Sequence, residues 1–408
     1  MPCNKDINVE IAIIGGGMAG LSAAQAFNKK GKKVALFEQY YCGSGASGKS
    51  SGFITPNAEL SLTDFADRYT IEVAQQIWNF IISGVQDIKT NIQDHEIICD
   101  YIPQDTVVLA NSKKALKELS IEHANLTKLG YKTSYYNQNA IREYVNSADY
   151  FGGVRYEGSF GINGYLYCQA LKKKLQQQGV IIFEETPVTS IDNHTLKTMH
   201  ANIKADYIIV CVDRFMPELN VLKQEIYHAQ TFLMISQQLT DQQVRTLFPI
   251  TNLMAWDTDL IYTYFRLTGD NRLLVGGGNF LTTYSSKADH EYAPMVRKLT
   301  HYIHKKFPQL KTQFEQLWPG LIGLSKDIGP IAGRDNKKPY LYYISAAAGL
   351  PIAAALGRYS AEHILEGRID LDPYFSPYRS FAIGGILQSV LGKKLSFALC
   401  NLKTRYIP

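Results

Sequence analysis

A chain of 408 residues that is 46% hydrophobic can bury the cores of two domains. Its net charge of +5 is spread along the sequence rather than gathered in a stripe, which argues against nucleic-acid binding. The six cysteines are widely spaced and no run of 18 uninterrupted apolar residues occurs, so we expect free thiols, no metal site and no membrane span. No apolar leader precedes the first predicted strand, which favours a cytoplasmic protein.

The first predicted elements are a strand, a tight turn and a helix. Residues 11–14 form a β-branched run typical of a buried parallel strand, and residues 18–29 are helix-prone. The turn between them fits the spacing G-x-G-x-x-G, which allows a sharp bend, a close approach to a pyrophosphate and tight packing of the helix on the strand. We therefore expect the diphosphate of a dinucleotide to contact Gly15, Gly17, Met18, Ala19 and Gly20.

An acidic residue ends the second predicted strand, residues 34–37. Glu38 follows Gly20 by 18 residues, about where a carboxylate receives the ribose hydroxyls of a dinucleotide. A carboxylate there would repel a 2′-phosphate, which argues against NADP. Glu38 and its neighbour Gln39 are therefore expected to contact the adenosine half of the cofactor.

The choice between NAD and FAD depends on the next segment. Residues 43–52, GSGASGKSSG, contain four glycines and four serines. Such a loop exposes many N–H groups and suits a chain that wraps an extended cofactor, although the same composition is also typical of a flexible linker. Its position directly after Glu38 favours FAD, with expected contacts at Gly45, Ala46, Ser47, Lys49, Ser50, Ser51 and Gly52.

These two motifs together resemble the FAD-binding start of the glycine oxidase and D-amino-acid oxidase family, and within it the gamma-glutamylputrescine oxidoreductase branch. The resemblance implies an α/β fold, in which a Rossmann-type FAD-binding domain is interleaved with an antiparallel-sheet substrate domain. It also implies FAD as cofactor and oxidation of a C–N bond. The chain departs from the family's G-A-S-G-R-N-G-G loop, because Lys49, Ser50 and Ser51 replace the Arg-Asn-Gly portion.

The middle of the chain predicts a helix at 165–178, with Gly179 as its C-cap, and a buried parallel strand at 207–212. The resemblance implies that this strand returns the chain to the FAD. It places the cofactor near Val188, Cys211 and Val212. The family's His-x-His-Pro before the helix is absent, since residues 163–166 read NGYL.

Residues 226–280 predict antiparallel strands, two of them joined by a turn at 268–271. The segment YFRLTGDNRLLVGGG is close to a pattern of the same branch. On one strand, Tyr262, Tyr264 and Arg266 would share a face, which is either a substrate surface or a solvated sheet face. We expect Tyr264 and Arg266 to be catalytic, and Phe53 and Tyr262 to bind substrate.

The last flavin signature runs from WPGLIGLSKDIGPIAG, residues 318–333, into a strand at 341–345 and a helix from residue 350. The N-terminus of that helix can stabilise negative charge on a reduced flavin. Pro351 removes one N–H donor from its first turn. The expected cofactor contacts here are Gly323, Gly349, Leu350, Pro351 and Ile352.

Two absences narrow the expected chemistry. The family's amino-acid oxidases usually carry an arginine just after the W-x-G segment, but residues 321–323 read LIG. A plain α-amino acid is thus less favoured than another amine, unless Arg266 substitutes. The sarcosine oxidases have a flavin-bonding cysteine near this position, and none occurs between Cys211 and Cys400, so FAD is expected to be noncovalent.

The sequence therefore predicts a discontinuous FAD-binding domain (9–60, 180–215 and 320–365), a substrate domain (61–179 and 216–319) and a C-terminal helical segment (366–408). The expected reaction is oxidation of a small amine, with oxygen or another acceptor reoxidising the flavin. The alternatives are a dehydrogenase that passes electrons to an acceptor such as quinone, or a catalytically silent flavin-binding protein. The apolar C-terminal segment either packs on the body or makes a peripheral membrane contact.

Overall fold

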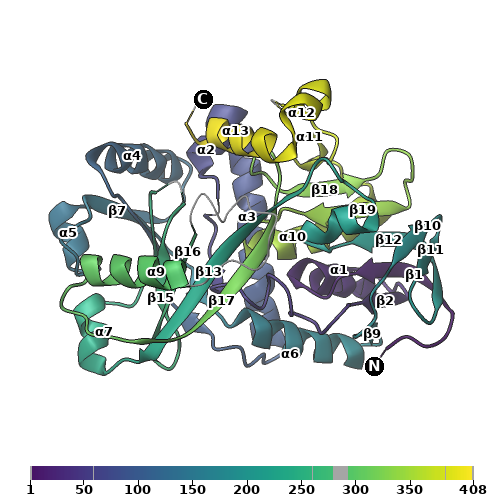
Figure 1. The fold of residues 1–408 in the computed structure, drawn as a ribbon, viewed down its shortest axis with the longest axis horizontal. Helices are drawn as coiled ribbons and strands as arrows, with labels where there is room; N and C mark the ends of the chain where they lie inside the picture. Colours follow the sequence, from purple (N-terminus) through teal and green to yellow (C-terminus); the bar gives the residue numbers. More distant parts are fainter. Residues whose placement is uncertain (1, 58, 260, 279–292, 382, 407–408) are drawn as a thin grey trace.

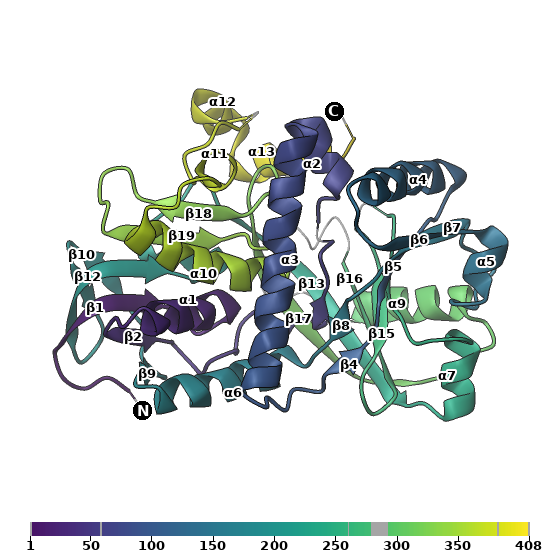
Figure 2. The same ribbon diagram turned by 180° about the vertical axis from the view of Figure 1, so that it is seen from behind.

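The computed structural model describes residues 2–57, 59–259, 261–278, 293–381 and 383–406. Two large sheets stand side by side, one in each half of the molecule (Figure 1). The long helix α3 (Ile71–Asp94) runs through the middle of the opposite view, between the two halves (Figure 2). A large cavity, lined by residues from segments 46–69 and 229–278 among others, lies where elements of the two halves meet.

The first sheet has a parallel centre in the order β12-β1-β2-β9, and β19 pairs in parallel with the end of β12. Alternate residues of β1 enter two different cores: Ile11 and Ile13 pack with α1, and Ala12 and Ile14 pack on the opposite face. This burial on both faces explains the continuous apolar run. The strands are β1 (Ile7–Ile14), β2 (Val34–Phe37), β9 (Ile181–Phe183), β10 (Ser190–Asp192), β11 (Thr195–Lys197), β12 (Asn202–Val210), β18 (Ile331–Arg334) and β19 (Leu341–Ser345).

The second sheet is mainly antiparallel, in the order β17-β13-β16-β15-β14-β5-β7-β6, with β14 and β5 parallel. One face packs on a separate core that includes Phe232, Phe265 and Val275. The other face is turned toward the first sheet. The strands are β5 (Thr106–Leu109), β6 (Thr133–Asn137), β7 (Gly152–Tyr156), β13 (Tyr227–Gln238), β14 (Met254–Asp257), β15 (Tyr264–Leu267), β16 (Arg272–Gly277) and β17 (Phe314–Leu324).

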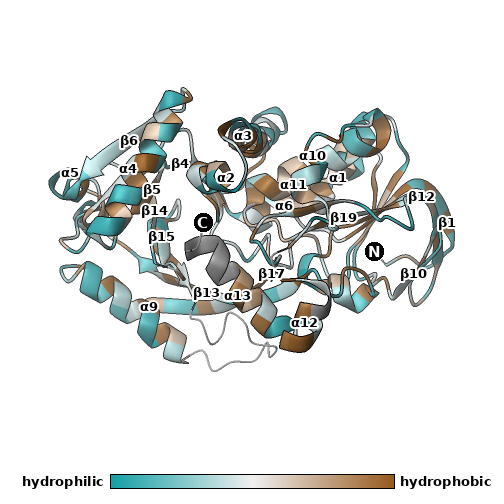
Figure 3. Cartoon of the chain, turned by 90° about the horizontal axis from the view of Figure 1, so that it is seen from above, coloured by the Kyte–Doolittle hydropathy of each residue, from teal (hydrophilic) through white to brown (hydrophobic). Residues whose placement is uncertain are grey.

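A small third sheet, β3 (Phe53–Ile54), β8 (Phe160–Gly161) and β4 (Ile102–Pro103), connects the two halves. Helices α4 and α9 mix hydrophobic and hydrophilic residues along their length, as expected for surface helices (Figure 3). The remaining helices are α1 (Met18–Lys29), α2 (Leu62–Arg68), α4 (Lys113–Lys128), α5 (Gln138–Arg142), α6 (Gly164–Gln177), η1 (Asp213–Leu219), α7 (Asp241–Leu247), α9 (Ala293–Lys306), α10 (Leu350–Glu366), α11 (Asp372–Phe375), α12 (Gly385–Leu391) and α13 (Lys393–Tyr406).

Most predicted elements are confirmed. The helix at 18–29 and the strands at 34–37 and 341–345 have the expected bounds. The helical region 60–100 is two helices, because Ser61 caps α2 and Thr70 begins a new cap for α3. The strand expected at 207–212 runs from Asn202 to Val210 and is parallel to β1. The expected domain boundary at 319/320 falls inside β17, a strand of the second sheet.

The C-terminal segment packs on the body of the protein. Phe397 and Cys400 of α13 are buried, and the Phe397 ring lies 5.5 Å from that of Tyr227 on β13. Across the part of the chain that the structure describes, no helix combines the length and apolar character needed to cross a membrane.

Candidate active site

The glycine turn between β1 and α1 is as tight as its spacing predicts. Gly15 has a φ of +104°, and a Cβ there would collide with the carbonyl of Cys211 at the end of β12. A Cβ on Gly20 would collide with the carbonyl of Gly15. The N-cap of helix α1, Gly17, provides no side-chain cap, so the positive end of the helix dipole can attract an anion beside the Met18 N–H, which Ser47 already engages.

The other expected adenosine contacts gather around the same edge of the first sheet. Glu38 is 8% exposed, and its Oε2 accepts a hydrogen bond of 2.7 Å from the N–H of Gly16. Its Oε1 accepts one of 3.0 Å from Tyr40. Val188 and Val212 pack against the core on the side of this sheet away from α1. The turn, the acid and the β12 end thus converge, as a dinucleotide site requires.

Residues 43–52, which we call the second Gly/Ser loop, link the two halves of the molecule. The Oγ of Ser47 accepts a hydrogen bond of 2.9 Å from the N–H of Met18 in the first turn of α1. Further along, the indole N–H of Trp318 on β17 donates to the carbonyl of Lys49 at 3.1 Å. The loop is therefore held by α1 on one side and by β17 on the other, so it is an ordered structure rather than a free linker.

A cavity of about 1500 Å³ opens between the two sheets. Its floor is shared by the end of the second Gly/Ser loop, the start of α10 and the inner face of the second sheet. Twelve of the predicted site residues line it: Ala46, Lys49, Ser50, Ser51, Gly52, Phe53, Tyr262, Tyr264, Gly349, Leu350, Pro351 and Ile352. The other fourteen do not: Gly15, Gly17, Met18, Ala19, Gly20, Glu38, Gln39, Gly45, Ser47, Val188, Cys211, Val212, Gly323 and Arg266.

The N-terminus of α10 is directed at this cavity. Its N-cap, Gly349, has a φ of +114° and provides no side-chain cap, and Pro351 occupies the first turn. A helix of 17 residues that starts uncapped in a cavity presents a partial positive charge there. That charge suits the electron-rich edge of a reduced flavin.

Arg266 is not a free substrate-binding cation. It is 2% exposed, and its guanidinium donates to the carbonyls of Ser51 at 2.6 Å, Ile162 at 2.7 Å and Leu267 at 3.0 Å. Burial lowers the pKa of this guanidinium to about 10. Arg266, the expected catalytic residue, is not part of the cavity lining, and its side chain holds the second Gly/Ser loop from behind the cavity wall.

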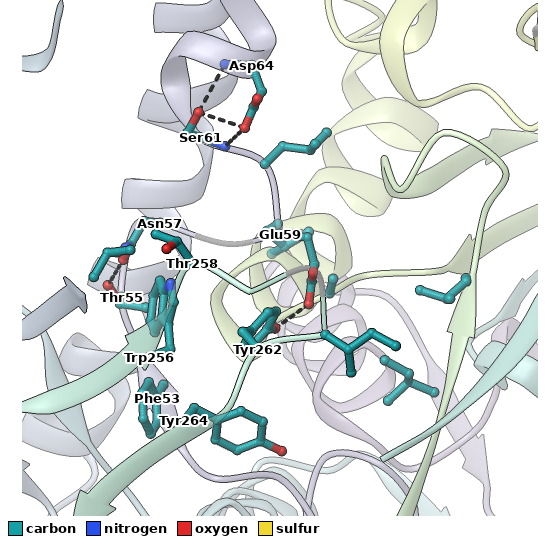
Figure 4. Close-up of a pocket in the computed structure, with 18 of the residues that line it drawn as sticks. Phe53, Thr55, Asn57, Glu59, Ser61, Asp64, Trp256, Thr258, Tyr262 and Tyr264 are labelled. Atoms are coloured by element: carbon teal, nitrogen blue, oxygen red, sulfur yellow. Dashed lines mark hydrogen bonds between the residues drawn. The ribbon is translucent and has the colours of Figure 1, made fainter. Parts of the chain in front are cut away.

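The two tyrosines do face the cavity, but they do not share a strand. Tyr264 lies on β15, opposite Trp256 of β14, whereas Tyr262 precedes the strand. The hydroxyl of Tyr262 donates to Oε1 of Glu59 at 2.5 Å, as Figure 4 shows. Burial raises the pKa of the Tyr264 phenol well above its usual range.

Two acids near the site, the half-buried Asp213 and the buried Asp257, were not anticipated. Asp213 accepts from the N–H of Gly323 at 2.6 Å and of Ala346 at 2.9 Å, so it joins β17 to the chain before α10. Its positive φ of 49° marks a special turn that no sequence motif indicates. Asp257 ends β14 and lines the cavity beside Trp256, although strand alternation alone would place these consecutive residues on opposite faces.

Asp257 supports the segment that carries Tyr262. Its Oδ2 accepts from the hydroxyl of Tyr302 at 2.5 Å, and its Oδ1 accepts from the N–H groups of Asp259 at 3.1 Å and Thr263 at 3.4 Å. Burial raises the pKa of this carboxyl group, while the Tyr302 hydrogen bond opposes that effect. The network fixes the backbone on both sides of Tyr262.

These elements fit FAD. The uncapped start of α1 suits the diphosphate, Glu38 suits the ribose, and the wide cavity with a positive helix end suits the isoalloxazine and a substrate. Within the described ranges, no group of three or more His, Cys, Asp or Glu side chains is placed to hold a metal ion.

Known proteins share both sequence and fold with this chain. The family model described as FAD dependent oxidoreductase matches residues 10–363. "Probable oxidoreductase OrdL" of Haemophilus influenzae is 25% identical over 89% of this chain and 84% of its own length. Gamma-glutamylputrescine oxidoreductase of Escherichia coli is 27% identical over 88% of this chain and 84% of its own length.

Among solved structures, glycine oxidase from Geobacillus kaustophilus superposes with a TM-score of 0.78 at 18% identity, covering 92% of this chain and all of that one. That likeness establishes the shared fold. The family match spans both the glycine turn and the start of α10, the two ends of the site. The chain therefore belongs to the family of FAD-dependent oxidoreductases, and FAD is its cofactor.

Proposed function

We propose that this protein oxidises the C–N bond of an amine or amino-acid derivative, with FAD bound noncovalently. Bound FAD would supply the chemistry by accepting a hydride from the carbon next to nitrogen. The substrate then leaves as an imine, which water hydrolyses to a carbonyl compound and an amine. The similarity to gamma-glutamylputrescine oxidoreductase and to glycine oxidase supports an amine or amino-acid substrate.

One observation carries the proposal: a single cavity is lined both by elements that fit the flavin and by a set of aromatic side chains that fit a small organic substrate. The second Gly/Ser loop and Gly349 form the cofactor side. Phe53, Trp256 and Tyr264 supply aromatic side chains to the same lining. A substrate held between these surfaces would be shielded from water, which favours hydride loss from a neutral amine.

The residues around the cavity have different roles in this proposal. The N-terminal end of α10 stabilises negative charge that develops on the cofactor. Arg266 is a positioning residue, because it holds the carbonyl of Ser51 and through it the loop beside Phe53. Tyr264 provides a wall of the substrate space and stays a neutral phenol at physiological pH, since its pKa is raised by burial.

Anaerobic mixing of the purified yellow holoenzyme with a panel of amines tests the proposal. The panel contains N-substituted amines, γ-glutamylated amines, diamines and α-amino acids, with the matching alcohols as controls. We expect at least one amine, and no alcohol, to bleach the oxidised flavin bands. If dithionite bleaches the flavin and no amine does, the proposed function is wrong and a silent flavoprotein is favoured.

Two finer points need their own measurements. Cys400 of α13 lines the cavity, so acid precipitation must show whether FAD is released to the supernatant, as we expect for noncovalent binding. The electron acceptor is tested by mixing reduced enzyme with air-saturated buffer and, separately, with a soluble quinone. Fast reoxidation by oxygen identifies an oxidase, and reoxidation by quinone alone identifies a dehydrogenase.

A further inference from the structure

Four aromatic side chains from three separate segments form a closed circle in the cavity. The ring centroid of Trp256 lies 5.9 Å from that of Phe53 and 6.4 Å from that of Tyr262. The ring centroid of Tyr264 lies 5.8 Å from that of Tyr262 and 6.0 Å from that of Phe53, which closes the circle. All four line the cavity and are half-buried. Figure 4 shows the four rings around a common space. We call this set the aromatic cage.

The size of the aromatic cage matches a cation. A positive charge equally distant from four centroids with these spacings lies about 4 Å from each, inside the ~6 Å reach of a cation–π contact. Neighbouring ring planes are inclined by 33°, 40°, 54° and 79°, so these rings do not cover one another face to face. A ring face that borders the common space is therefore not covered by its neighbours in the circle and is available to a ligand there.

The charged side chains around the aromatic cage also favour a cationic ligand. The carboxylate of Glu59 is held at the cage by the hydroxyl of Tyr262 at 2.5 Å. Arg266, which follows Tyr264 by two residues, is engaged by three backbone carbonyls. Arg379, elsewhere in the cavity lining, is paired with Asp327 at 2.7 Å. A carboxylate beside an aromatic cage favours an ammonium group and opposes a carboxylate ligand.

We propose that the aromatic cage and Glu59 bind an alkylated ammonium group of the substrate, and that this nitrogen is not the one oxidised. Hydride loss requires a neutral amine, whereas the cage stabilises a cation, so the reacting nitrogen must lie outside the cage. The substrate class is then a small amine that carries a second, cationic nitrogen. This inference rests on the proposed function for the reacting nitrogen, but cation binding is measurable without turnover.

Calorimetric titration of the holoenzyme with choline and with its neutral isostere, 3,3-dimethylbutan-1-ol, tests cation binding. We expect choline to bind at least 10-fold more tightly. Trp256→Leu and Glu59→Gln should each reduce that preference several-fold, while Trp256→Phe retains most of it because an aromatic face remains. Tyr69→Leu, which changes an aromatic residue of the same cavity outside the cage, is the matched control and should leave the preference unchanged. Equal binding of the two ligands by the wild type would overturn the proposal.

Turnover separates this inference from the proposed function. The matched substrates are ω-aminoalkyl-trimethylammonium ions of increasing chain length and their tert-butyl isosteres, mixed anaerobically with holoenzyme. We expect one length of the cationic series to bleach the flavin at a concentration at least 10-fold lower than its isostere. Bleaching by both series without preference would contradict cation binding by the aromatic cage and would still support the proposed amine oxidation. If the enzyme prefers choline but no amine bleaches the flavin, cation binding by the aromatic cage is supported and the proposed function is wrong.

Discussion

The Nε of Arg266 lies 2.6 Å from the carbonyl oxygen of Ser51, so a strand of the second sheet holds the loop that borders the cofactor side of the cavity. The rest of the guanidinium is used by Ile162 and Leu267. Three acceptors on one planar cation are a fixed arrangement that a lysine cannot reproduce. The consequence is a coupling between the stability of the fold and the binding of FAD.

We predict that Arg266→Lys loses about 2–4 kcal/mol of unfolding free energy, because at least one buried carbonyl loses its charged donor. The affinity for FAD should fall as well, since the Ser51 loop is released. Denaturant unfolding and fluorescence titration with FAD measure the two effects. Arg245→Lys, at an exposed position of α7, is the control and should change neither. An Arg266→Lys variant with normal FAD affinity would contradict the positioning role.

A second prediction concerns Glu122, a buried acid of α4 that lines the cavity. Its oxygens accept from the N–H groups of Leu62 at 3.1 Å and Thr63 at 2.8 Å, at the start of α2. Burial raises the pKa of Glu122 above its usual value near 4.5, although these hydrogen bonds oppose the shift. The folded protein therefore binds the proton more tightly than the unfolded chain does. This stabilising contribution is complete below pH 4.5 and is lost as the pH rises through the raised pKa.

Urea unfolding of the wild type and of Glu122→Gln at several pH values measures this effect. The stability of the wild type relative to the variant should decrease as the pH rises from 4.5, since Gln carries no titrating group. Glu118→Gln, one turn away on the exposed face of α4, should show no such trend. A relative stability that increases with pH would mean that the hydrogen bonds outweigh burial.

The order of the elements and the cofactor half of the site were predictable, and the reasons are local. Buried parallel strands such as 34–37 and 341–345 are continuous apolar runs, and the glycine turn has a spacing that few other structures need. The substrate side was less predictable. Arg266 points into the body because Gly52 and Gly161 leave room for its guanidinium, and a Cβ on either would crowd it. These contacts join distant segments, so no local pattern reveals them.

The aromatic cage shows the same limit. Tyr264 and Trp256 follow from strand alternation, since their neighbours Phe265 and Ala255 are buried on the opposite face of the sheet. Glu59 lies in an irregular segment before α2, and only the fold brings it to Tyr262. Glu59 and Tyr262 are about 200 positions apart in the chain, so no local sequence pattern could predict that they are partners.

A third prediction concerns the pair of Asp327 and Arg379. Two bonds join them, Nη2 to Oδ1 at 2.7 Å and Nε to Oδ2 at 2.8 Å. Burial acts to raise the pKa of Asp327, but Arg379 and Arg68 outweigh it, and the pKa is lowered. The stabilising contribution is therefore present at neutral pH and is lost as the pH falls through the lowered pKa.

Arg379→Met should cost about 2–4 kcal/mol of unfolding free energy at neutral pH, because the half-buried carboxylate of Asp327 loses its main partner. The loss should shrink on acidification, when Asp327 becomes protonated. The control is Arg272→Met, whose ion pairs with Asp270 and Glu315 lie at the surface and should contribute only about 0–1 kcal/mol. Similar losses in the two variants would show that Asp327 is reached by solvent.

The last prediction separates cofactor binding from helix stability at the two ends of α10. Gly349 begins the helix with a φ of +114° in the cavity, and Gly367 ends it with a φ of +74°. Alanine at either position is strained, at a cost of about 1–3 kcal/mol. Gly349→Ala should also weaken FAD binding about 10-fold, because relief of the strain turns the first N–H groups away from the cofactor. Gly367→Ala, far from the cavity, should lower the melting temperature and leave the Kd for FAD unchanged. Equal loss of FAD affinity in both variants would mean that the start of α10 has no special part in binding the flavin.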